Sequence, residues 1–424
     1  MRPRSERLAP ADEANLVLDH AGQVNVFLVA GTLSPGGFVD AHGRADVAAL
    51  RAALHDRTAA LPALRKVLAI EGRHHVWRES EPDLTLHVRE TARVAGIEGL
   101  ESLCARLMTV PLDMRRPLWE MLIVPGAGPA GPAVVLRIHH AIADGMAAIA
   151  IVHQLFDAST PGAPVAPARR PPSRRRLRAR LGYGLHRIRA TLFGREVGET
   201  VLLGDRSDNR GVLFLDADLS ALETRTRRQG ATINDGLLAA VAAGYRAALT
   251  AAGEQIPQQL PVSIPVALDR RGSAGNQVGV MLARLPLGVS DPDERLALIA
   301  AQTRAEKGVA RDQGTLEFMR GPIGARVMDR LARGQHLVGG FVTNVRGPAA
   351  RQRLAGAPID RIWPIAVIAA NVRLGVAALS VGGRLCCGIH FDEANVPGAE
   401  FARAMREELD RLVSASGRVT NLDS

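Results

Sequence analysis

A change of composition near the middle of the chain constrains the fold more than any other feature. From residue 158 to residue 201 the sequence becomes rich in Pro, Ala and Arg, and the stretch PGAPVAPARRPPS precedes a run of arginines. Such stretches connect domains and do not fill hydrophobic cores. With 424 residues, the chain is long enough for two cores of ordinary size. We therefore expect an N-terminal domain at residues 1–157, a linker at 158–206 and a C-terminal domain at 207–424.

Both halves mix the apolar spacing of strands with that of helices. In the N-terminal half this spacing predicts strands at 24–31, 74–77, 84–88 and 133–138 and helices at 47–55, 100–107 and 147–155. In the C-terminal half it predicts strands at 211–216, 259–265, 278–287 and 338–344, a hairpin of 374–380 with 384–391, and helices at 234–249, 291–308 and 399–413. The expected fold class is therefore α/β in both halves.

The net positive charge of the chain is confined to the linker. Ten arginines and no acidic residue lie from Arg169 to Arg195, which equals the whole net charge of +10. Nucleic-acid-binding proteins usually spread basic residues over one face and interleave aromatic ones, whereas aromatic residues are only 3% here. We therefore expect no nucleic-acid partner. The linker is predicted to be a solvated connection, a contact with anionic lipid or a site for the phosphates of CoA.

The number of cysteines and the length of the apolar stretches indicate the cellular compartment in which we expect the protein. The three cysteines, Cys104, Cys386 and Cys387, cannot build a disulfide framework, which favours a reducing cytosol. The N-terminus lacks the pattern of a secretory signal, and the longest uncharged apolar stretches fall short of the ~20 residues that span a bilayer. We expect a cytoplasmic protein whose membrane contact is peripheral.

The strongest chemical signal is the stretch HHAIADG at residues 139–145. It follows a predicted buried strand and precedes a predicted apolar helix. A histidine at the end of such a strand is held rigidly, and its near-neutral pKa suits it to take a proton from a hydroxyl or a thiol. In the alternative interpretation, His139 and His140 merely end the strand and Asp144 caps the helix. The residues alone leave both interpretations open.

Other kinds of catalytic site have less support. Adjacent histidines on a strand point to opposite faces, and no third ligand stands at a suitable spacing, so we expect no metal. The sequence also lacks a GxSxG elbow, a Walker A loop and a GxGxxG fingerprint. A base without a protein nucleophile suggests that a bound acceptor attacks an activated acyl group directly.

Five stretches, in this order, resemble motifs of one known family. They are Pro117-Leu118-Trp119, the HHAIADG stretch, Asn234-Asp235, the GNQVG stretch around Asn276 followed by LPLGVSDPDERL, and the TNVRGP stretch around Asn344 followed by LAGAPI and Trp363-Pro364. The family is that of bacterial wax ester synthases/diacylglycerol acyltransferases. It belongs to the superfamily of CoA-dependent acyltransferases, with chloramphenicol acetyltransferase and peptide-synthetase condensation domains. The resemblance extends from Leu8 to about Val413.

The resemblance implies a fold and roles for residues. The fold would be two pseudo-symmetric chloramphenicol-acetyltransferase-like domains with a tunnel between them. His140 would be the general base, His139 could assist in positioning, and Asp144 would orient the loop, with Gly145 completing the motif. The remaining motif residues would be framework or would shape the acyl pocket; they are Pro117, Leu118, Trp119, Asn234, Asp235, Asn276 and Asn344.

Three places depart from the family pattern. Asn25 and Val26 stand where members usually show a Met-His-Val-Gly-like segment, and Arg346 replaces a proline. The segment after Trp363-Pro364 lacks the usual Gly- and Tyr-containing pattern. These positions would line the expected tunnel, so they concern the choice of substrate more than the chemistry.

The expected activity is therefore transfer of a long-chain acyl group from acyl-CoA to diacylglycerol or to a fatty alcohol. Acyl-CoA would be a substrate, and no cofactor is expected. The protein would lie at an anionic inner membrane face or at lipid droplets. Two alternatives stay open, namely acylation of another hydroxyl, such as that of a polyketide diol or a glycolipid, and a non-catalytic lipid-binding homologue.

Overall fold

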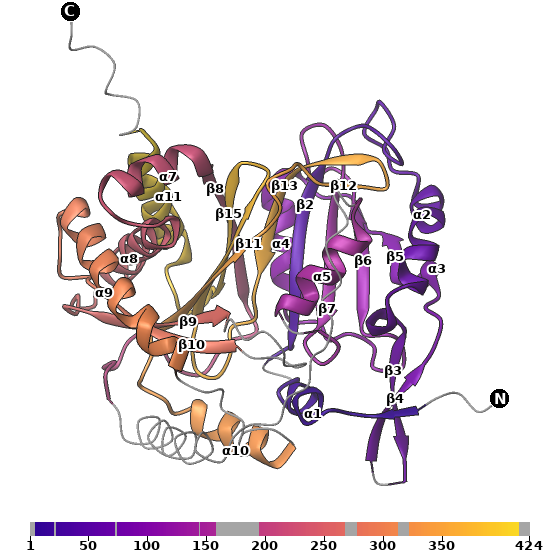
Figure 1. Ribbon diagram of the computed structural model, residues 1–424, viewed down its shortest axis with the longest axis horizontal. Helices are drawn as coiled ribbons and strands as arrows, with labels where there is room; N and C mark the ends of the chain where they lie inside the picture. Colours follow the sequence, from indigo (N-terminus) through magenta and orange to yellow (C-terminus); the bar gives the residue numbers. More distant parts are fainter. Residues whose placement is uncertain are drawn as a thin grey trace, which may run out of the picture. The chain divides into compact units, whose positions relative to one another are not determined.

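The computed structural model describes residues 5–20, 23–72, 74–143, 145–157, 195–267, 278–312 and 322–414. Contacts within the chain divide it into two compact units (Figure 1). Of the described residues, unit 1 contains those within 1–162, 320–326 and 346–367, and unit 2 contains the others. Both units combine helices with a sheet, which confirms the predicted α/β class.

The main sheet of unit 1 is mostly antiparallel and holds the HHAIADG stretch at its centre. Its strands lie in the order β12(Arg353–Leu354), β13(Ala357–Ile365), β2(Val26–Leu33), β7(Ala133–His139), β6(Trp119–Val124) and β5(Val88–Glu90). Strands β5 and β6 are parallel, whereas β7 is antiparallel to both β2 and β6. Every residue of β7 is buried, as expected of a strand that is covered on both faces. The end of β7 is therefore held rigidly within unit 1.

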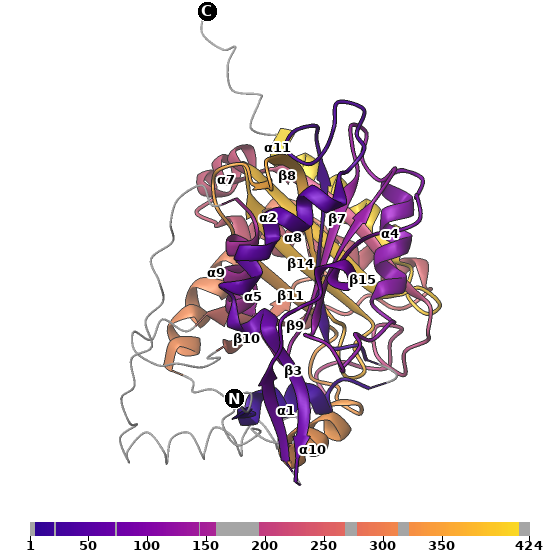
Figure 2. The ribbon, with the colours of Figure 1, turned by 90° about the vertical axis from the view of Figure 1, so that its right-hand side faces the viewer.

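A small second sheet and several short helices complete unit 1. The sheet has the order β1(Ser5–Arg7), β4(His74–Glu79) and β3(Lys66–Glu71). The helices are α1(Pro10–Val17), α2(Val47–Ala59), η1(Pro62–Arg65), α3(Leu84–His87), α4(Gly96–Leu107) and α5(Gly145–Leu155). Figure 2 shows α1 beside the β3–β4 hairpin. A buried apolar cluster of Leu8, Trp77, Leu118 and Ala141, with Leu16 packed against it, connects this region to the loop after β7.

The strand predicted at residues 84–88 is wrong for most of its length. Residues Leu84–His87 form the one-turn helix α3, and only Val88 belongs to a strand, β5. The side chain of Asp83 caps the turn, because it accepts hydrogen bonds from the Thr85 amide at 2.9 Å and from the Thr85 hydroxyl at 2.6 Å. A capping carboxylate of this kind favours a helical turn over an extended chain.

Unit 1 also contains a segment from the C-terminal half of the chain. The sequence predicts one domain over residues 207–424, whereas Arg346–Val367 belongs to unit 1. There β13 pairs antiparallel with β2, from Ile359 opposite Leu33 to Ile365 opposite Leu28. The physical reason is that β2 has one edge paired with β7, so β13 satisfies the backbone groups of the other edge. Figure 1 shows β13 beside β2.

The main sheet of unit 2 is also mixed. Its strands lie in the order β10(Val278–Leu285), β9(Leu260–Ala267), β11(Gly340–Arg346), β14(Leu374–Val381), β15(Arg384–Asp392) and β8(Arg210–Asp218). The predicted hairpin is confirmed, because Val381 pairs with Arg384 across a two-residue loop. Gly382 and Gly383 have φ values of 55° and 79°, which suit glycine and give the turn that matches the twist of a hairpin.

Helices cover the core of unit 2. They are α7(Leu219–Arg228), α8(Ile233–Ala251), α9(Pro292–Asp312), α10(Pro322–Ala332), whose first residues belong to unit 1, and α11(Gly398–Ser414). Helix α8 is buried along most of its length. Tyr245 of α8 meets Phe401 of α11 edge to face, with ring centroids 5.0 Å apart. The two helices approach so closely at Gly244 that a Cβ there would lie 2.9 Å from the Phe401 ring.

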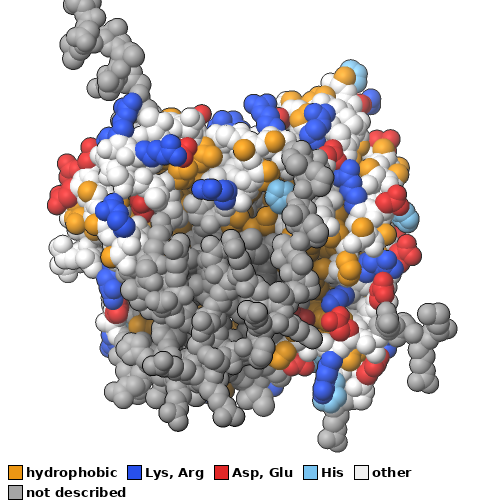
Figure 3. Space-filling model, viewed as in Figure 1, with side chains coloured by type: hydrophobic (Ala, Val, Ile, Leu, Met, Phe, Trp, Pro, Cys, Tyr) orange, Lys and Arg blue, Asp and Glu red, His pale blue; other side chains and the backbone are white. Residues whose placement is uncertain are grey.

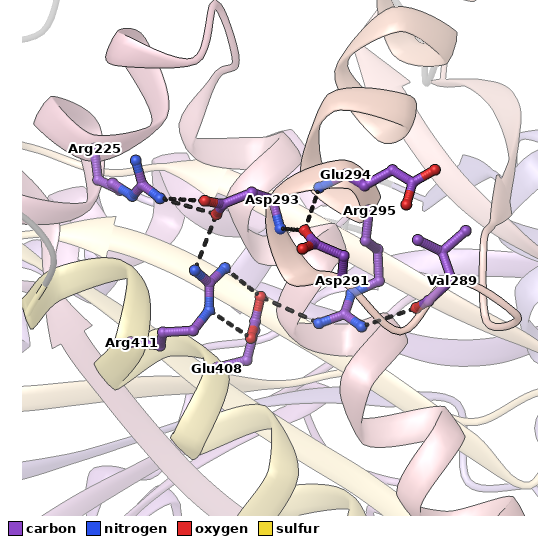
Figure 4. Close-up of polar contacts among 8 residues, drawn as sticks. All are labelled: Arg225, Val289, Asp291, Asp293, Glu294, Arg295, Glu408 and Arg411. Carbon is purple, nitrogen blue, oxygen red and sulfur yellow. Dashed lines mark hydrogen bonds and ion pairs between the residues drawn. The ribbon is translucent and has the colours of Figure 1, made fainter.

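An ion-pair network joins three of these helices (Figure 4). Asp293 of α9 accepts hydrogen bonds from Arg225 of α7 at 2.8 Å and from Arg411 of α11 at 3.0 Å. Glu408 of α11 binds Arg411 at 2.9 Å and lies 3.3 Å from Arg295 of α9, and both Glu408 and Arg295 are buried. Buried charges are stable only when paired, so this network fixes the packing of the three helices.

The described part of the predicted linker lies in unit 2. Residues 158–194 of this linker are outside the described residues. Val197, Leu202 and Leu203 are buried in the apolar core of unit 2, although the predicted linker extends to residue 206. These apolar side chains pack because burial removes them from water. Among the described helices, none is long and apolar enough to cross a membrane.

Candidate active site

The HHAIADG stretch joins the centre of the unit 1 sheet to helix α5. His139 is the last residue of β7, and α5 begins at Gly145, so the predicted strand and helix are both present. The backbone amide of His139 donates to the carbonyl of Leu118 at 3.0 Å, and the Ile142 amide donates to the His139 carbonyl at 3.1 Å. The loop therefore leaves the sheet in a tight turn.

His139 is fully buried, and a polar group lies close to each of its ring nitrogens. Its Nδ1 accepts a hydrogen bond from the Ala141 amide at 2.9 Å. Its Nε2 lies 3.3 Å from Oδ2 of Asp19 without forming a hydrogen bond in this geometry. His139 shares a strand face with Arg137, whose guanidinium binds Glu120 and the carbonyls of Leu107 and Val110. The side chain of His139 is therefore enclosed by protein.

His140 follows on the other side of the chain and has different surroundings. Its backbone amide donates to the Asn25 carbonyl at 3.0 Å, and its carbonyl accepts from Nδ2 of Asn15 at 3.2 Å. Its ring is half-buried and meets the Phe27 ring edge to face, with centroids 5.4 Å apart. Among the described residues, none forms a hydrogen bond with the imidazole of His140 that would occupy its nitrogens. The backbone is thus fixed while the ring stays available.

The enclosure of His140 also sets its charge. Desolvation by the surrounding protein lowers the pKa of His140 to about 4, and the neighbouring His139 contributes a smaller effect in the same direction. The imidazole is therefore neutral at physiological pH. A neutral imidazole has one lone pair and can accept a proton, which a general base must do.

Two predicted site residues lie outside the described residues. These are Asp144, within the loop, and Asn276. The predicted roles of Asp144 in orienting the loop and of Asn276 in the framework stay predictions.

The Pro117-Leu118-Trp119 stretch supports the histidine loop from β6. The Leu118 carbonyl receives the His139 amide, and its side chain is completely buried. Trp119 donates from Nε1 to the Leu64 carbonyl at 3.0 Å and stacks on His87, with centroids 4.7 Å apart. Both side chains thus have structural partners, as expected of framework residues.

Asn234 and Asp235 begin helix α8 in unit 2. Asp235 is buried and forms a capping box with Thr232, whose backbone amide donates to it at 2.8 Å. The hydroxyl of Thr303 in α9 donates to the other Asp235 oxygen at 2.6 Å. These contacts cap α8 and join it to α9. Asn234 is half-buried beside it.

Asn344 lies on β11 of unit 2. Its Oδ1 atom is buried and has no hydrogen-bond partner among the residues that the structure describes. The predicted framework role of Asn344 and the predicted tunnel between the domains stay predictions.

The sequence did not reveal three polar residues that contact the histidine loop in unit 1. Asn15, on α1, and Asp19, just after it, lie four residues apart in an otherwise apolar stretch, NLVLD. The sequence marks Asn25 only as a departure from the family pattern, yet its carbonyl accepts the hydrogen bond from the His140 amide. The sequence signal for Asn15 and Asp19 is their helical spacing within an apolar stretch, but such spacing alone more often indicates a solvated face.

The described residues offer no metal site. Nowhere in the described part of the chain do three His, Cys, Asp or Glu side chains gather closely enough to hold a metal ion. The three cysteines are free and buried.

Comparison with known proteins settles the family. The model of the wax ester synthase/diacylglycerol acyltransferase catalytic domain matches residues 8–197, and the model of the WS/DGAT C-terminal domain matches residues 274–413. A protein of Mycobacterium tuberculosis (strain ATCC 25618 / H37Rv), named as a probable diacylglycerol O-acyltransferase, is 31% identical over 383 residues, which cover 81% of this chain and 80% of that protein. The chain belongs to the wax ester synthase/diacylglycerol acyltransferase family. The predicted enzyme class, an acyl-CoA-dependent O-acyltransferase, is thereby confirmed.

Solved structures agree with the fold. The wax ester synthase/diacylglycerol acyltransferase from Marinobacter aquaeolei VT8 has a TM-score of 0.73 at 20% identity, over 97% of this chain and 100% of that one. The first condensation domain of the CDA synthetase has a TM-score of 0.60 at 15% identity, over 98% of this chain and 97% of that one. These likenesses confirm the predicted α/β fold.

Proposed function

We propose that this acyltransferase moves a long-chain acyl group from acyl-CoA to the free hydroxyl of diacylglycerol, with His140 as the general base. The observation that carries this proposal is the imidazole of His140, which is neutral, half-buried and attached to a backbone held at both its amide and its carbonyl. The choice of diacylglycerol rests on the names of the mycobacterial relatives, which are called diacylglycerol O-acyltransferases.

The reaction follows from what a neutral imidazole can do. The acceptor oxygen attacks the thioester carbonyl carbon and forms the new C–O bond, while His140 takes the hydroxyl proton. The tetrahedral intermediate then collapses, the C–S bond breaks, and His140 returns the proton to the CoA sulfur. The products are the ester and free CoA, and no protein group is acylated.

The lowered pKa of His140 has a consequence for this step. A base of pKa about 4 is weak in the free protein, although it is fully available at pH 7. Negative charge that develops on the thioester oxygen stabilises a nearby imidazolium, so the base becomes stronger during the reaction. We therefore infer that His140 is a stronger base in the transition state than in the resting protein.

We also propose that the enzyme works at an anionic membrane or droplet surface on the cytoplasmic side. The support is the sequence from Arg169 to Arg195, with its ten arginines and no acidic residue. On the described part of the surface in Figure 3, by contrast, basic and acidic side chains are interspersed. Each basic residue near an anionic surface contributes about 1 kcal/mol.

An acceptor panel tests the chemistry. CoA release from palmitoyl-CoA is measured with diacylglycerol, with hexadecanol, with a glycolipid or diol, and without acceptor. We expect diacylglycerol to raise the rate most and His140→Ala to abolish the increase. His42→Ala, which changes an exposed histidine of the same unit, is the matched control. Preference for hexadecanol would make the protein a wax ester synthase, and preference for the other hydroxyls would identify that alternative. Binding of acyl-CoA without turnover would indicate a lipid-binding homologue.

Vesicle flotation tests the surface. Replacing Arg174, Arg175 and Arg176 with Gln is expected to weaken binding to vesicles rich in phosphatidylglycerol about 100-fold, from ~1 kcal/mol for each charge. The control makes the same charge change at three exposed arginines elsewhere, Arg44, Arg115 and Arg403, and should change binding far less. Equal binding to neutral phosphatidylcholine vesicles would refute the proposal.

A further inference from the structure

A chain of polar contacts leads from the N-terminal helix of unit 1 to the histidine loop. Asp19 follows α1, its side chain is 6% exposed, and its Oδ1 accepts the Asn25 amide at 2.9 Å. Its Oδ2 lies 3.3 Å from Nε2 of His139. Nδ2 of Asn25 donates to the Asn15 carbonyl at 2.8 Å, and Asn15 donates to the His140 carbonyl. The buried Asp19 carboxylate thus lies beside His139 and also binds Asn25, whose carbonyl holds the His140 amide.

The contacts determine which nitrogen of His139 carries the proton. The Ala141 amide donates to Nδ1, so Nδ1 must present its lone pair and carries no hydrogen. The neutral ring then has its hydrogen on Nε2, which faces Asp19. A carboxylate charge at 3.3 Å attracts this N–H and would repel a lone pair. We propose that Asp19 is a positioning residue, which keeps His139 in the Nε2–H tautomer and thereby holds the loop that carries His140.

The tautomer matters because of where Ala141 lies. The hydrogen bond from the Ala141 amide to the His139 ring joins the two residues that flank His140. It therefore fixes the turn around the residue that we propose as the base. The same Asp19 carboxylate holds Asn25, whose carbonyl receives the His140 amide. If His139 carried its hydrogen on Nδ1 instead, that hydrogen would point at the Ala141 amide hydrogen, and the turn would have to open. Asp19 itself touches neither His140 nor any group that reacts.

Asp19→Asn changes the charge and keeps the shape. If its oxygen still accepts the Asn25 amide, the new NH2 group points at Nε2–H of His139 and two donors face each other. Either the ring changes tautomer and loses Ala141, or it turns away. We expect kcat to fall by about 10- to 100-fold, because displacements of about 1 Å at a catalytic group have effects of this size. KM for palmitoyl-CoA should stay within about threefold, since no substrate contact changes.

Asp12→Asn is the matched control. Asp12 lies on α1, is partly buried and accepts a hydrogen bond from Nε1 of Trp77 at 2.9 Å, which an amide oxygen can also accept. It therefore carries the same substitution on the helix that Asp19 follows, and its side-chain hydrogen bond goes to Trp77 and not to the histidines. Its kcat should stay within about twofold of wild type.

The closing experiment combines these kinetics with ¹⁵N NMR of the histidine rings, with the signals of His139 assigned from a His139→Gln variant. This inference rests on the proposed function only for its kinetic part. We expect wild-type His139 to have a protonated Nε2 and an unprotonated Nδ1, and Asp19→Asn to lose that signature together with kcat. Wild-type His139 protonated at Nδ1 would overturn the inference, as would wild-type kcat in Asp19→Asn or an equal loss in Asp12→Asn. If no acceptor supports turnover, the proposed function fails, and the wild-type spectrum, which needs no variant to fold, still decides the tautomer.

Discussion

Replacing Asp157 with alanine tests how unit 1 holds the segment it takes from the C-terminal half of the chain. Asp157 follows α5 and accepts hydrogen bonds from the Gly356 amide at 2.7 Å, the Ala355 amide at 3.1 Å and Arg57 at 2.6 Å. Gly356 and Ala355 form the turn between β12 and β13, so one carboxylate fixes the end of this hairpin. Burial alone would raise the pKa of Asp157, but the bonds from Gly356 and Arg57 outweigh it and hold this pKa below its usual range.

The expected loss follows from these contacts. A hydrogen bond to a charged group contributes about 1.5–3 kcal/mol. The Arg57 and Asp157 side chains are 30% and 25% exposed, so their ion pair is counted at no more than about 1 kcal/mol. With the two backbone bonds taken at the low end of this range and the ion pair neglected, Asp157→Ala should destabilise unit 1 by about 3 kcal/mol. This loss corresponds to a fall in Tm of about 6–12 °C for a unit of this size.

Two assays measure the loss of stability in Asp157→Ala. Calorimetry gives the Tm of the first transition, and hydrogen exchange shows whether the amides of β13 exchange faster than those of β7. Asp360→Ala is the control, because Asp360 lies on the same hairpin, is exposed and makes one bond, to the Ser34 hydroxyl. A change in Tm below 2 °C, or exchange that rises equally in both strands, would refute the reasoning.

Three further predictions concern other parts of the fold. Gly244→Ala would place a methyl group 2.9 Å from the Phe401 ring and should lower the free energy of unfolding of unit 2 by about 1–3 kcal/mol through overpacking. The urea midpoint of unit 2 measures this loss, and an unchanged midpoint would contradict the close packing of α8 on α11. Asp235→Ala removes the capping box and the bond from Thr303 and should cost about 2–4 kcal/mol in the same assay, whereas Asp235→Asn should cost less because it keeps an acceptor. Burial lowers the pKa of His140 to about 4, so between pH 6.5 and pH 4 the unfolded chain binds more protons at this residue than the folded chain, and stability is lost as the pH falls through this range. His140→Gln should therefore lose less Tm over that range than wild type. Equal pH slopes of Tm in the two proteins would show that the His140 ring is not desolvated.

Much of the fold could be predicted because it depends on local patterns. The buried run of β7, the cap and apolar length of α8, and the Gly382-Gly383 turn are each written in consecutive residues. Residues 84–88 were mispredicted because a single carboxylate, Asp83, decides between a strand and a turn. The place of Arg346–Val367 could not be predicted, since it depends on which sheet edge in the folded protein is open to it and not on its own sequence.

The candidate site divides in the same way. His139 and His140 could be found because an unusual dipeptide ends a buried strand. Asn15 and Asp19 could not, because polar residues at helical spacing usually form a solvated face, and only the folded chain shows these two turned towards the histidines. Family resemblance predicted which residues carry the reaction, and the structure shows which residues contact the predicted histidines.

The most direct test of the central claim is the product of the reaction. The purified enzyme is given palmitoyl-CoA and diacylglycerol in mixed micelles, and triacylglycerol and free CoA are measured together over time, for wild type and for His140→Ala. We predict that wild type forms one triacylglycerol for each CoA released and that His140→Ala forms at least about 100-fold less, because general base catalysis contributes 10²–10⁴-fold. Triacylglycerol formed at the wild-type rate by His140→Ala would contradict the role of His140 as the base.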